Sequence, residues 1–198
     1  MAVADIILSP ATVWYAPVGE TLPDENLIDY GEAWGGNWVS VGYTSIPLSV
    51  SLTRETYEVM VEQLTTPVRE MIIRENLLFE TALAELTGDN LLLALGGTLT
   101  ETAAGAAQRA MDELEMGGDP DIAEYAFGFE GFYKDAAGTQ FPVRLFVYKG
   151  VAIMNGALQF SKAQASTIPM QIKAKADTSK VVGKQLVKIQ KVTATGTS

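Results

Sequence analysis

Apolar and polar residues alternate along residues 70–83, which predicts a long β-strand with one buried face. The apolar parity begins at Met71 and continues through Leu77 and Phe79 to Leu83. The opposite parity carries most of the charged residues of this stretch. A strand of this length needs neighbouring strands to satisfy its backbone, so we expect it to lie within a sheet.

The preceding residues, 54–69, carry several acids and end in Thr-Thr-Pro, a composition that predicts a long loop. A structureless loop of about sixteen residues is uncommon in a compact domain unless it has a function. Its apolar residues are too many for a solvated linker: Tyr57, Val59, Met60, Val61 and Leu64. We therefore expect the loop to bind another surface. The alternative is an ordinary β-hairpin with an irregular bulge.

Short β-prone segments separated by turn residues make up much of the remaining chain. They are expected at residues 12–16, 38–43, 46–52, 111–116, 125–133, 141–147, 151–161 and 167–176. Residues 87–96 predict the one helix, because Thr87 can cap its start and Gly96 suits its end. Residues 98–109 mix alanine with threonine and glycine, which predicts a surface loop or a helical turn. Together these elements indicate an all-β sandwich or barrel with one short flanking α-helix.

The composition excludes several kinds of chemistry. The chain has 198 residues, 47% of them hydrophobic, which is enough for one domain over residues 1–198 with a substantial core. It has no cysteine and no histidine, which excludes disulfides, thiol nucleophiles, imidazole bases and the usual zinc sites. No apolar run approaches the ~18 residues of a membrane span, and no basic stretch opens the chain, so we expect neither a membrane segment nor a signal peptide.

Charge is unevenly distributed along the chain, whose formal net charge is −10. Residues 1–133 hold 22 acids and 4 bases, whereas residues 134–198 hold 2 acids and 10 bases. This segregation favours opposite-sign surfaces that meet between copies of the chain, since complementary potentials steer encounter and set register. The alternative is that the two parts interleave in the fold and neutralise each other locally.

The clusters of carboxylates do not form a known reactive pattern. Asp119, Asp121 and Glu124 could in principle ligate calcium, but their spacing is not that of an EF-hand loop. Glu75 and Glu80 could be read as a glycosidase pair, but the sequence offers no aromatic cleft to bind a sugar. We therefore expect no metal, no cofactor and no catalytic site.

Six segments resemble a known family in their order and spacing. They are Val13–Gly19, Trp38–Thr44, Thr65–Arg69, Phe79–Gly96, Leu158–Lys162 and Ile168–Met170. Through these segments the chain resembles the major tail tube proteins of bacteriophages with long, non-contractile tails. The similarity extends over most of the chain and includes no single diagnostic motif.

This resemblance implies a structural virion protein of the tail. The family's subunits form hexameric rings that stack into a hollow tube, and each subunit contributes strands to one inner β-barrel through which DNA passes. The resemblance also implies partners at the tube's core and ends, namely the tape measure protein, the tail terminator and distal tail proteins. Assembly would occur in the host cytoplasm, without membrane insertion of the subunit.

The resemblance also implies roles for particular residues. The loop that bridges successive rings falls on residues 52–69, with Arg54, Glu55, Tyr57, Glu58, Met60, Glu62 and Arg69 as its contact residues. The strand that follows is expected to line the bore with Glu70, Arg74, Asn76 and Glu80. A basic C-terminal arm over residues 183–198 would make contacts through Lys184, Lys188 and Lys191.

Two other functions remain open at this stage. One is a β-sandwich binding module, such as an accessory tail or capsid decoration protein, which predicts an exposed aromatic cluster of Trp14, Trp34 or Trp38. The other is the tube subunit of a contractile tail, a gene-transfer particle or a secretion machine. The subunit's own sequence does not separate these tubes, because they differ in the sheath that surrounds them.

Overall fold

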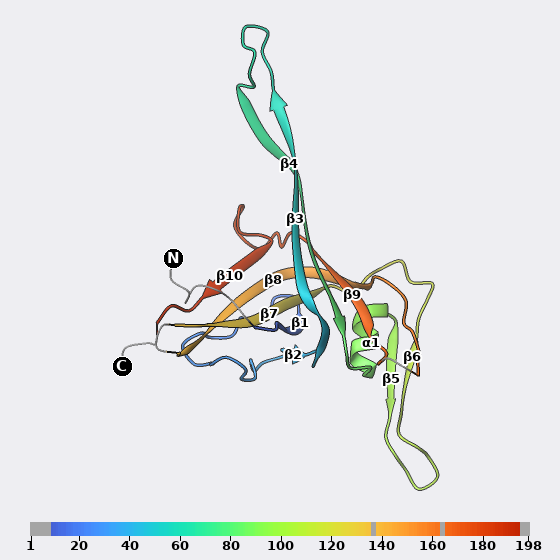
Figure 1. Cartoon of the computed structure of the whole chain (residues 1–198). Helices are drawn as coiled ribbons and strands as arrows, with labels where there is room; N and C mark the ends of the chain where they lie inside the picture. The colour runs from blue at the N-terminus through green and yellow to red at the C-terminus, as the bar shows by residue number, and fades with distance from the viewer. Residues whose placement is uncertain (1–8, 136–137, 163–164, 195–198) are drawn as a thin grey trace.

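The computed structural model describes residues 9–135, 138–162 and 165–194, and β-strands dominate it (Figure 1). In chain order the elements are β1 (Thr12–Pro17), β2 (Val39–Ser40), β3 (Thr44–Val59), β4 (Arg69–Leu83), α1 (Gly88–Leu95), β5 (Thr98–Thr102), β6 (Met111–Glu115), β7 (Tyr125–Lys134), β8 (Gln140–Met154), β9 (Ile168–Ala174) and β10 (Val187–Lys191). Strands hold 48% of the residues and helix 4%, which confirms the predicted all-β fold with one short helix.

Eight strands form one antiparallel sheet in the order β2-β1-β7-β8-β9-β4-β3, with β10 added beside β8. Strand β8 organises this sheet because it is 15 residues long and has different partners along its length. Residues 143–147 pair with β10, residues 150–154 pair with β9, and β7 pairs with the other edge of the strand. Strands β9 and β10 therefore follow one another along one edge of β8.

The core lies on the inner face of this curved sheet. Strand β9 buries alternate residues, Ile168, Met170, Ile172 and Ala174, which is the parity that the sequence pattern predicts. The ring of Phe79 on β4 stacks on Phe129 of β7 with 4.8 Å between centroids. Burial of these apolar side chains supplies the main driving force for folding, roughly 1.5–3 kcal/mol for each large side chain.

Helix α1 begins and ends where its capping residues predict. The hydroxyl of Thr87 accepts a hydrogen bond from the Asn90 backbone N–H at 3.2 Å, and Gly96 ends the helix with a positive φ of 72°. The buried Asn90 side chain donates to the carbonyls of Val41 and Glu85, at 3.0 Å each. The helix is thereby fixed to the loop before β3 and to the end of β4.

Three predicted boundaries are wrong. Residues 54–59 and 69 of the predicted loop 54–69 belong to strands β3 and β4, which pair with a register shift, so the alternative of a hairpin with a bulge is the correct one. Residues 98–102 form strand β5, because alternating threonines favour an extended chain that pairs with β6. The strand expected at 151–161 is the end of β8, which stops at Met154.

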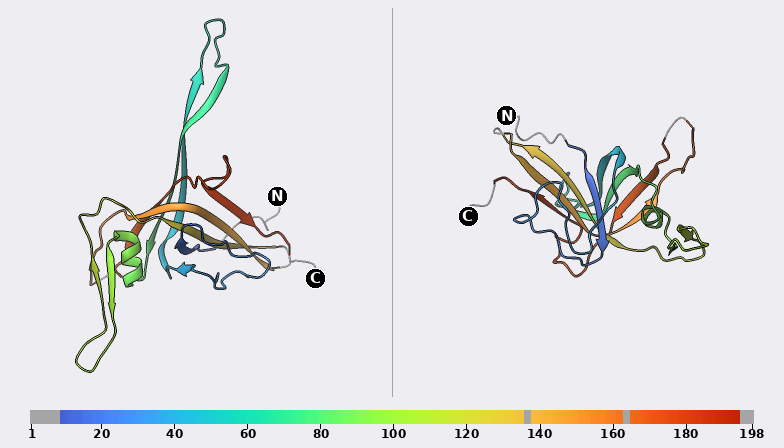
Figure 2. Two further views of the ribbon diagram at one scale, coloured as in Figure 1. Left: turned by 180° about the vertical axis from the view of Figure 1, so that it is seen from behind. Right: turned by 90° about the horizontal axis from the view of Figure 1, so that it is seen from below.

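Two hairpins project from the body in opposite directions (Figures 1 and 2). Strands β3 and β4 extend together beyond the sheet, and the tip between them spans residues 60–68. Strands β5 and β6 form a separate two-stranded sheet beside α1, with a tip at residues 103–110. Each projecting part is held mainly by its own cross-strand pairing.

Candidate interaction surfaces

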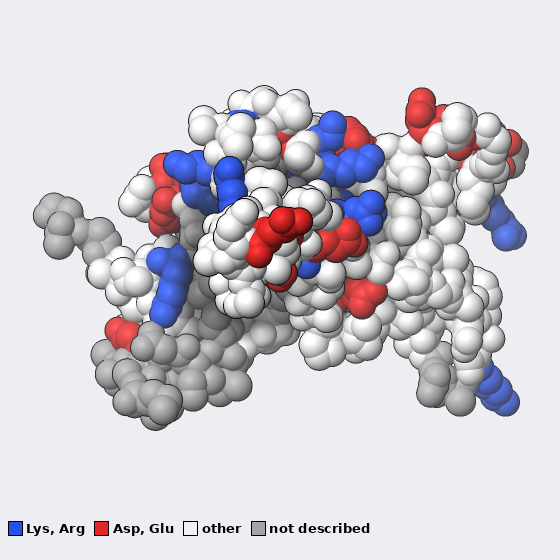
Figure 3. Space-filling view, turned by 90° about the horizontal axis from the view of Figure 1, so that it is seen from above, with Lys and Arg blue, Asp and Glu red and all other residues white. Residues whose placement is uncertain are grey.

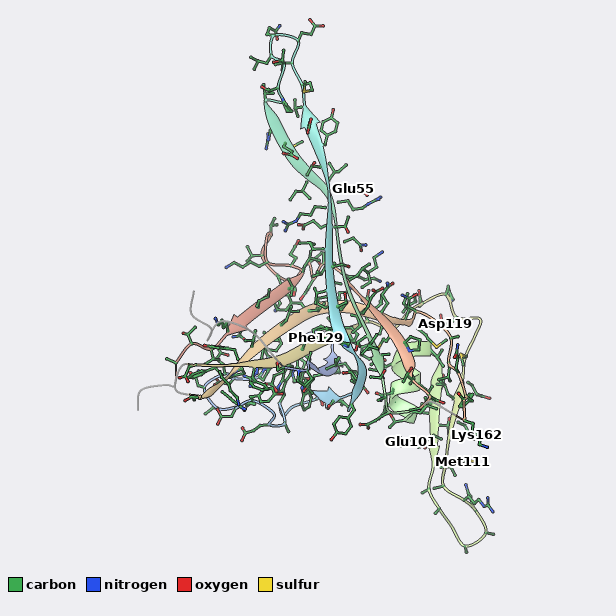
Figure 4. All side chains as sticks on the ribbon, in the orientation of Figure 1. Glu55, Glu101, Met111, Asp119, Phe129 and Lys162 are labelled. Carbon is green, nitrogen blue, oxygen red and sulfur yellow. The ribbon has the colours of Figure 1, made fainter. Side chains whose placement is uncertain are left out.

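The stem of the β3–β4 hairpin is held by two cross-strand ion pairs. Arg54 lies directly opposite Glu75, with its Nε 2.7 Å from the Glu75 Oε1, and Glu55 lies opposite Arg74, with 3.2 Å between Oε1 and Nη1. All four side chains are partly or largely exposed, so each pair contributes about 1 kcal/mol at most. The pairs mainly fix the register of the stem. The stem itself stands clear of the body, as the position of Glu55 shows (Figure 4).

The outer part of this hairpin exposes large apolar side chains on both faces. They are Tyr57, Met60, Val61, Leu64, Val68, Met71, Ile72 and Ile73, and Ile73 reaches 62% exposure. The tip is closed by a hydrogen bond from the Val68 N–H to the Val59 carbonyl at 2.9 Å. A contiguous apolar surface of this kind marks a site of interaction with another protein.

Glu58 and Glu70 are direct cross-strand partners near the tip. Like charges in this position destabilise an isolated hairpin. Among the described residues, neither carboxylate lies within 4 Å of a basic side chain. The predicted loop contacts Met60 and Glu62 lie on the tip itself, and Arg69 begins β4. The arrangement favours contact with a surface that supplies positive charge.

The four residues expected to face a bore share one parity of β4 but lie in two environments. Asn76 and Glu80 lie where β4 joins or approaches the sheet, and the Glu80 Oε1 accepts hydrogen bonds from Gln171 at 2.7 Å and Asn155 at 3.3 Å. Glu70 and Arg74 lie on the projecting hairpin, beyond the pairing with β9. The sheet therefore holds two of the four residues, and the hairpin carries the other two away from it.

The basic C-terminal segment is part of the sheet over residues 187–191. Strand β10 pairs with β8, and the hydroxyl of Tyr133 donates to the Val192 carbonyl at 2.7 Å. Lys184 precedes the strand, Lys188 is exposed on it, and the Nζ of Lys191 lies 4.5 Å from the Tyr133 ring centroid. Residues 187–191 of the expected arm 183–198 thus form a strand of the sheet, and residues 195–198 lie outside the described part.

Acidic and basic parts of the chain interleave in places. Glu124 contacts two lysines, with its Oε2 2.6 Å from the Lys149 Nζ and its Oε1 3.0 Å from the Lys175 Nζ. Hydrogen bonds from Lys149 and Lys175 hold the pKa of the Glu124 carboxyl below its usual value. Other lysines remain on the face from which the β3–β4 hairpin projects, where basic side chains gather beside the hairpin (Figure 3). Local neutralisation of the two parts thus occurs at Glu124, and opposite-sign surfaces that meet between copies stay a prediction.

The carboxylates weighed for chemistry serve structural contacts. Glu75 pairs with Arg54, while Glu80 lies on the opposite parity of β4. Asp119 accepts a hydrogen bond from the Asp121 backbone N–H at 2.9 Å, which orders a turn. Over residues 9–135, 138–162 and 165–194, no three potential ligands gather closely enough to hold a metal ion.

The tryptophans expected on the surface of a binding module are largely buried. Trp34 is 3% exposed and Trp38 is 7% exposed, and the Trp14 ring stacks on Trp34 with 5.2 Å between centroids. They pack with Phe146 on the outer side of the sheet, under the loop that precedes β2. The prediction of an exposed aromatic cluster is wrong, and the support that it gave to a binding module is lost.

A buried ion pair escaped the sequence analysis. Arg144 on β8 contacts Glu130 on β7, with 2.9 Å between Nε and Oε1, and both side chains are at most 1% exposed. The Nη2 of Arg144 also donates to the Ile28 carbonyl at 2.6 Å, and the Gly31 N–H donates to Glu130 at 3.1 Å. Glu130 and Arg144 lie directly opposite each other in the paired strands, a register that the sequence alone does not reveal.

Among the described residues, no helix has the length and apolar character needed to cross a membrane. A family model described as phage tail tube protein matches residues 4–189. The chain belongs to the phage tail tube protein family. No curated protein matches it. This tail tube protein is thus a structural component of the phage tail, and the resemblance found in its sequence is confirmed at the level of the family.

Proposed function

We propose that this tail tube protein forms hexameric rings that stack into the DNA conduit of a long, non-contractile tail, and that the β3–β4 hairpin bridges successive rings. The rings assemble in the host cytoplasm around the tape measure protein, and terminator and distal tail proteins close the ends. The role is structural, without catalysis.

The projecting hairpin carries this proposal. It exposes apolar side chains on both faces, although such residues are normally buried by a partner. The family supports a partner of the same kind, because a tube repeats one subunit along its axis. A contact between different surfaces of identical copies need not close on itself, so it builds a filament.

Free backbone edges also support assembly. Within the described chain, β3 pairs with β4 alone, and residues 69–77 of β4 pair with β3 alone. Such edges are normally blocked, covered or joined to another strand. If each of six copies contributed four strands, 24 strands spaced about 4.8 Å apart and tilted about 40° would close a barrel roughly 48 Å across its backbone. A bore of that size would admit duplex DNA.

The outer face of the sheet near Glu80 is our candidate for the bore. Asn76 and Glu80 share the exposed parity of β4, and Gln171 of β9 lies opposite Glu80. Carboxylates on a bore repel DNA phosphates, so a passing duplex would not adhere. Glu70 and Arg74 would extend this lining toward the next ring, because the hairpin carries them away from the sheet.

The experiment is to shorten the hairpin without disturbing its base. Because Arg54 and Glu75 are register partners, an Asn-Gly turn can replace residues 55–74 and close the hairpin at this pair. We expect a folded subunit with an unchanged circular dichroism spectrum that forms no tubes in negative-stain electron microscopy, at concentrations where the natural chain forms them.

Point variants supply a matched control. Tyr57→Ser, Met60→Ser and Leu64→Ser remove exposed apolar side chains from the outer part of the hairpin, whereas Leu27→Ser and Phe160→Ser remove even more exposed apolar side chains elsewhere. Tubes should be lost with the tip variants and retained with the controls. Tubes of normal length from the shortened protein would refute the bridging role, and a natural chain that remains monomeric across salt and concentration would refute assembly itself.

A further inference from the structure

A groove runs along the stem of the β3–β4 hairpin, between it and the segment that enters β10. Its volume is about 840 Å³. Most of its lining is apolar, with Val50, Leu52, Ile72, Ile73, Leu77 and Phe79 from the hairpin and Leu186, Val187 and Ile189 from the C-terminal side. Leu52 and Ile189 remain largely exposed within the described chain. The groove is therefore an unfilled apolar surface at the base of the hairpin.

The rim of this groove is basic. Lys184 lines it, and no carboxylate of residues 9–135, 138–162 or 165–194 forms an ion pair with this side chain. The two arginines of the lining, Arg54 and Arg74, already pair with acids of the hairpin. The loop before Lys184 carries two exposed valines, of which Val182 is 87% exposed, and Lys180, whose Nζ lies 5.0 Å from the centroid of the Tyr148 ring. An occupant with acidic and apolar surface would complement this rim.

The β5–β6 hairpin has the complementary surface. Its strands carry Glu101, Asp112, Glu113 and Glu115, and Glu101 lies directly opposite Asp112. Like charges facing each other destabilise a strand pair. None of these four acids forms an ion pair with a lysine or arginine of the described chain. Figure 4 shows Glu101 on β5, on the hairpin that points away from the groove side of the body.

The tip of this hairpin is narrow. Residues 103–110 read Ala-Ala-Gly-Ala-Ala-Gln-Arg-Ala, and all are exposed. The Gly105 N–H donates to the Gln108 carbonyl at 2.9 Å, which holds the turn. Six of these eight residues are alanine or glycine and can enter a groove that would exclude larger side chains, whereas the polar side chains of Gln108 and Arg109 would have to remain outside it.

We infer that the β5–β6 hairpin of one copy inserts its tip into the groove of the next copy, with its acids against Lys184 and Lys180. This inference deepens the proposed function and rests on it. The groove lies on the side from which the β3–β4 hairpin projects, and the β5–β6 hairpin points the opposite way (Figures 1 and 2). Each copy thus carries the β5–β6 hairpin at one end and the groove that would bind it at the other, as an open stack of identical copies requires.

The tip of the β3–β4 hairpin fits the groove less well. It also carries acids, Glu58 and Glu62, but it projects from the same side as the groove. In a head-to-tail stack it would point toward the copy above it but meet the opposite side of that copy, because the groove of that copy faces away from it. The β5–β6 hairpin is the acidic projection that points toward the groove of a neighbour.

The first test removes the tip of the β5–β6 hairpin. Thr102 and Met111 are register partners, so an Asn-Gly turn can replace residues 103–110 and close β5 on β6. We expect a folded subunit whose critical concentration for tube formation rises by about tenfold or more, as for the loss of ~1.4 kcal/mol at a contact. Equal tube formation by the shortened and natural chains overturns the inference while leaving the proposed tube intact. A natural chain that never forms tubes overturns both.

The second test exchanges charges. Glu101→Lys with Asp112→Lys should raise the critical concentration, and Lys180→Glu with Lys184→Glu should raise it as well. Mixing the two variant proteins, or combining all four changes in one chain, should restore tubes. Lys134→Glu, at the exposed end of β7, is the matched control and should leave assembly unchanged. Failure of the combined variant, when each variant alone is folded, contradicts the pairing.

The third test detects the contact directly. The chain has no cysteine, so pairs of introduced thiols report on one contact only. Ala106 lies at the hairpin tip and the exposed Ala176 lines the groove. Oxidised tubes of the Ala106→Cys and Ala176→Cys double variant should yield a series of disulfide-linked multimers on a denaturing gel. This outcome would place the two residues close together, because a disulfide needs Cα atoms within about 7 Å. A ladder from Ala106→Cys with Leu27→Cys instead would place the tip elsewhere and overturn the inference.

Discussion

Replacing Glu130 by glutamine should lower the free energy of unfolding of the subunit by about 3 kcal/mol. The carboxylate is fully buried, it accepts a hydrogen bond from Arg144, and it also accepts the Gly31 N–H. Glutamine preserves the shape of the side chain but leaves the buried guanidinium without a negative partner. Arg144 is additionally fixed by the Ile28 carbonyl, so it cannot reach water without releasing the loop that covers it.

The magnitude follows from the cost of an unpaired buried charge. Removing one partner of such a pair typically costs 3–5 kcal/mol, whereas replacing both by apolar residues is often close to neutral. We therefore expect Arg144→Met to be as damaging as Glu130→Gln, and the double variant Glu130→Leu with Arg144→Met to be less damaging than either. A cycle of Glu130→Leu, Arg144→Met and the double variant then measures the coupling of the pair.

Urea denaturation of the monomeric subunit, followed by tryptophan fluorescence, is the assay, since Trp34 packs beside Arg144 with 5.9 Å between the guanidinium carbon and the ring centroid. A loss of about 3 kcal/mol corresponds to a fall in Tm of roughly 6–12 °C for a chain of this size. A loss below about 1 kcal/mol for Glu130→Gln would show that water reaches the pair and would refute the reasoning.

Three further predictions concern the body of the subunit. Gly128→Ala should destabilise it by about 1–3 kcal/mol in the same assay, because an added Cβ would overlap the Trp34 ring; an unchanged midpoint would mean that the ring can move aside. Asn90→Ala should lower the free energy of unfolding by about 1–3 kcal/mol, since the carbonyls of Val41 and Glu85 lose their donor. Asn90→Asp should be no more stable, because a carboxylate cannot donate these hydrogen bonds. Burial, and then Asp89, raises the pKa of the Tyr15 hydroxyl to about 12, so the folded state holds this proton more tightly and stability should fall as pH rises from about 10 to 12. Tyr15→Phe should flatten that decline, which a pH series of denaturation curves would detect.

Local signals in the sequence were sufficient for the elements whose stability is local. Thr87 and Gly96 cap α1 by contacts within a few residues, so the helix could be predicted with its ends. The alternating burial of β9 could be predicted because one face packs on the core and the other does not. In both cases the order of apolar and polar residues in the sequence matches the order of buried and exposed positions in the structure.

The outer part of β3, residues 54–59, was expected to be a loop because neither face of the projecting hairpin meets the core. With both faces exposed, alternation between apolar and polar residues no longer reports on strand structure. The interactions that support its stem, such as Arg54 with Glu75, join residues 21 positions apart and become visible only when the register is known. Its apolar content predicts contact with another surface, which stays a prediction, whereas the extended conformation of residues 54–59 could not be predicted.

The buried pair of Glu130 and Arg144 was missed for a different reason. Both faces of β8 are covered at this position, one by the core and the other by the loop before β2. A loop that folds back over a sheet leaves no periodic trace in the sequence. Charged residues in a strand are usually exposed, so the pattern pointed to the surface instead of the interior.

The two projecting hairpins depend on pairing within themselves, whereas the sheet joins segments that are far apart in the chain. Their outer amide protons can therefore exchange with deuterium through small local openings while the sheet remains closed. A neighbour seated on either hairpin would suppress those openings. Hydrogen–deuterium exchange would consequently follow polymerisation at individual amides. The sheet would exchange slowly before and after assembly, and slow exchange would extend to the hairpins only in the tube.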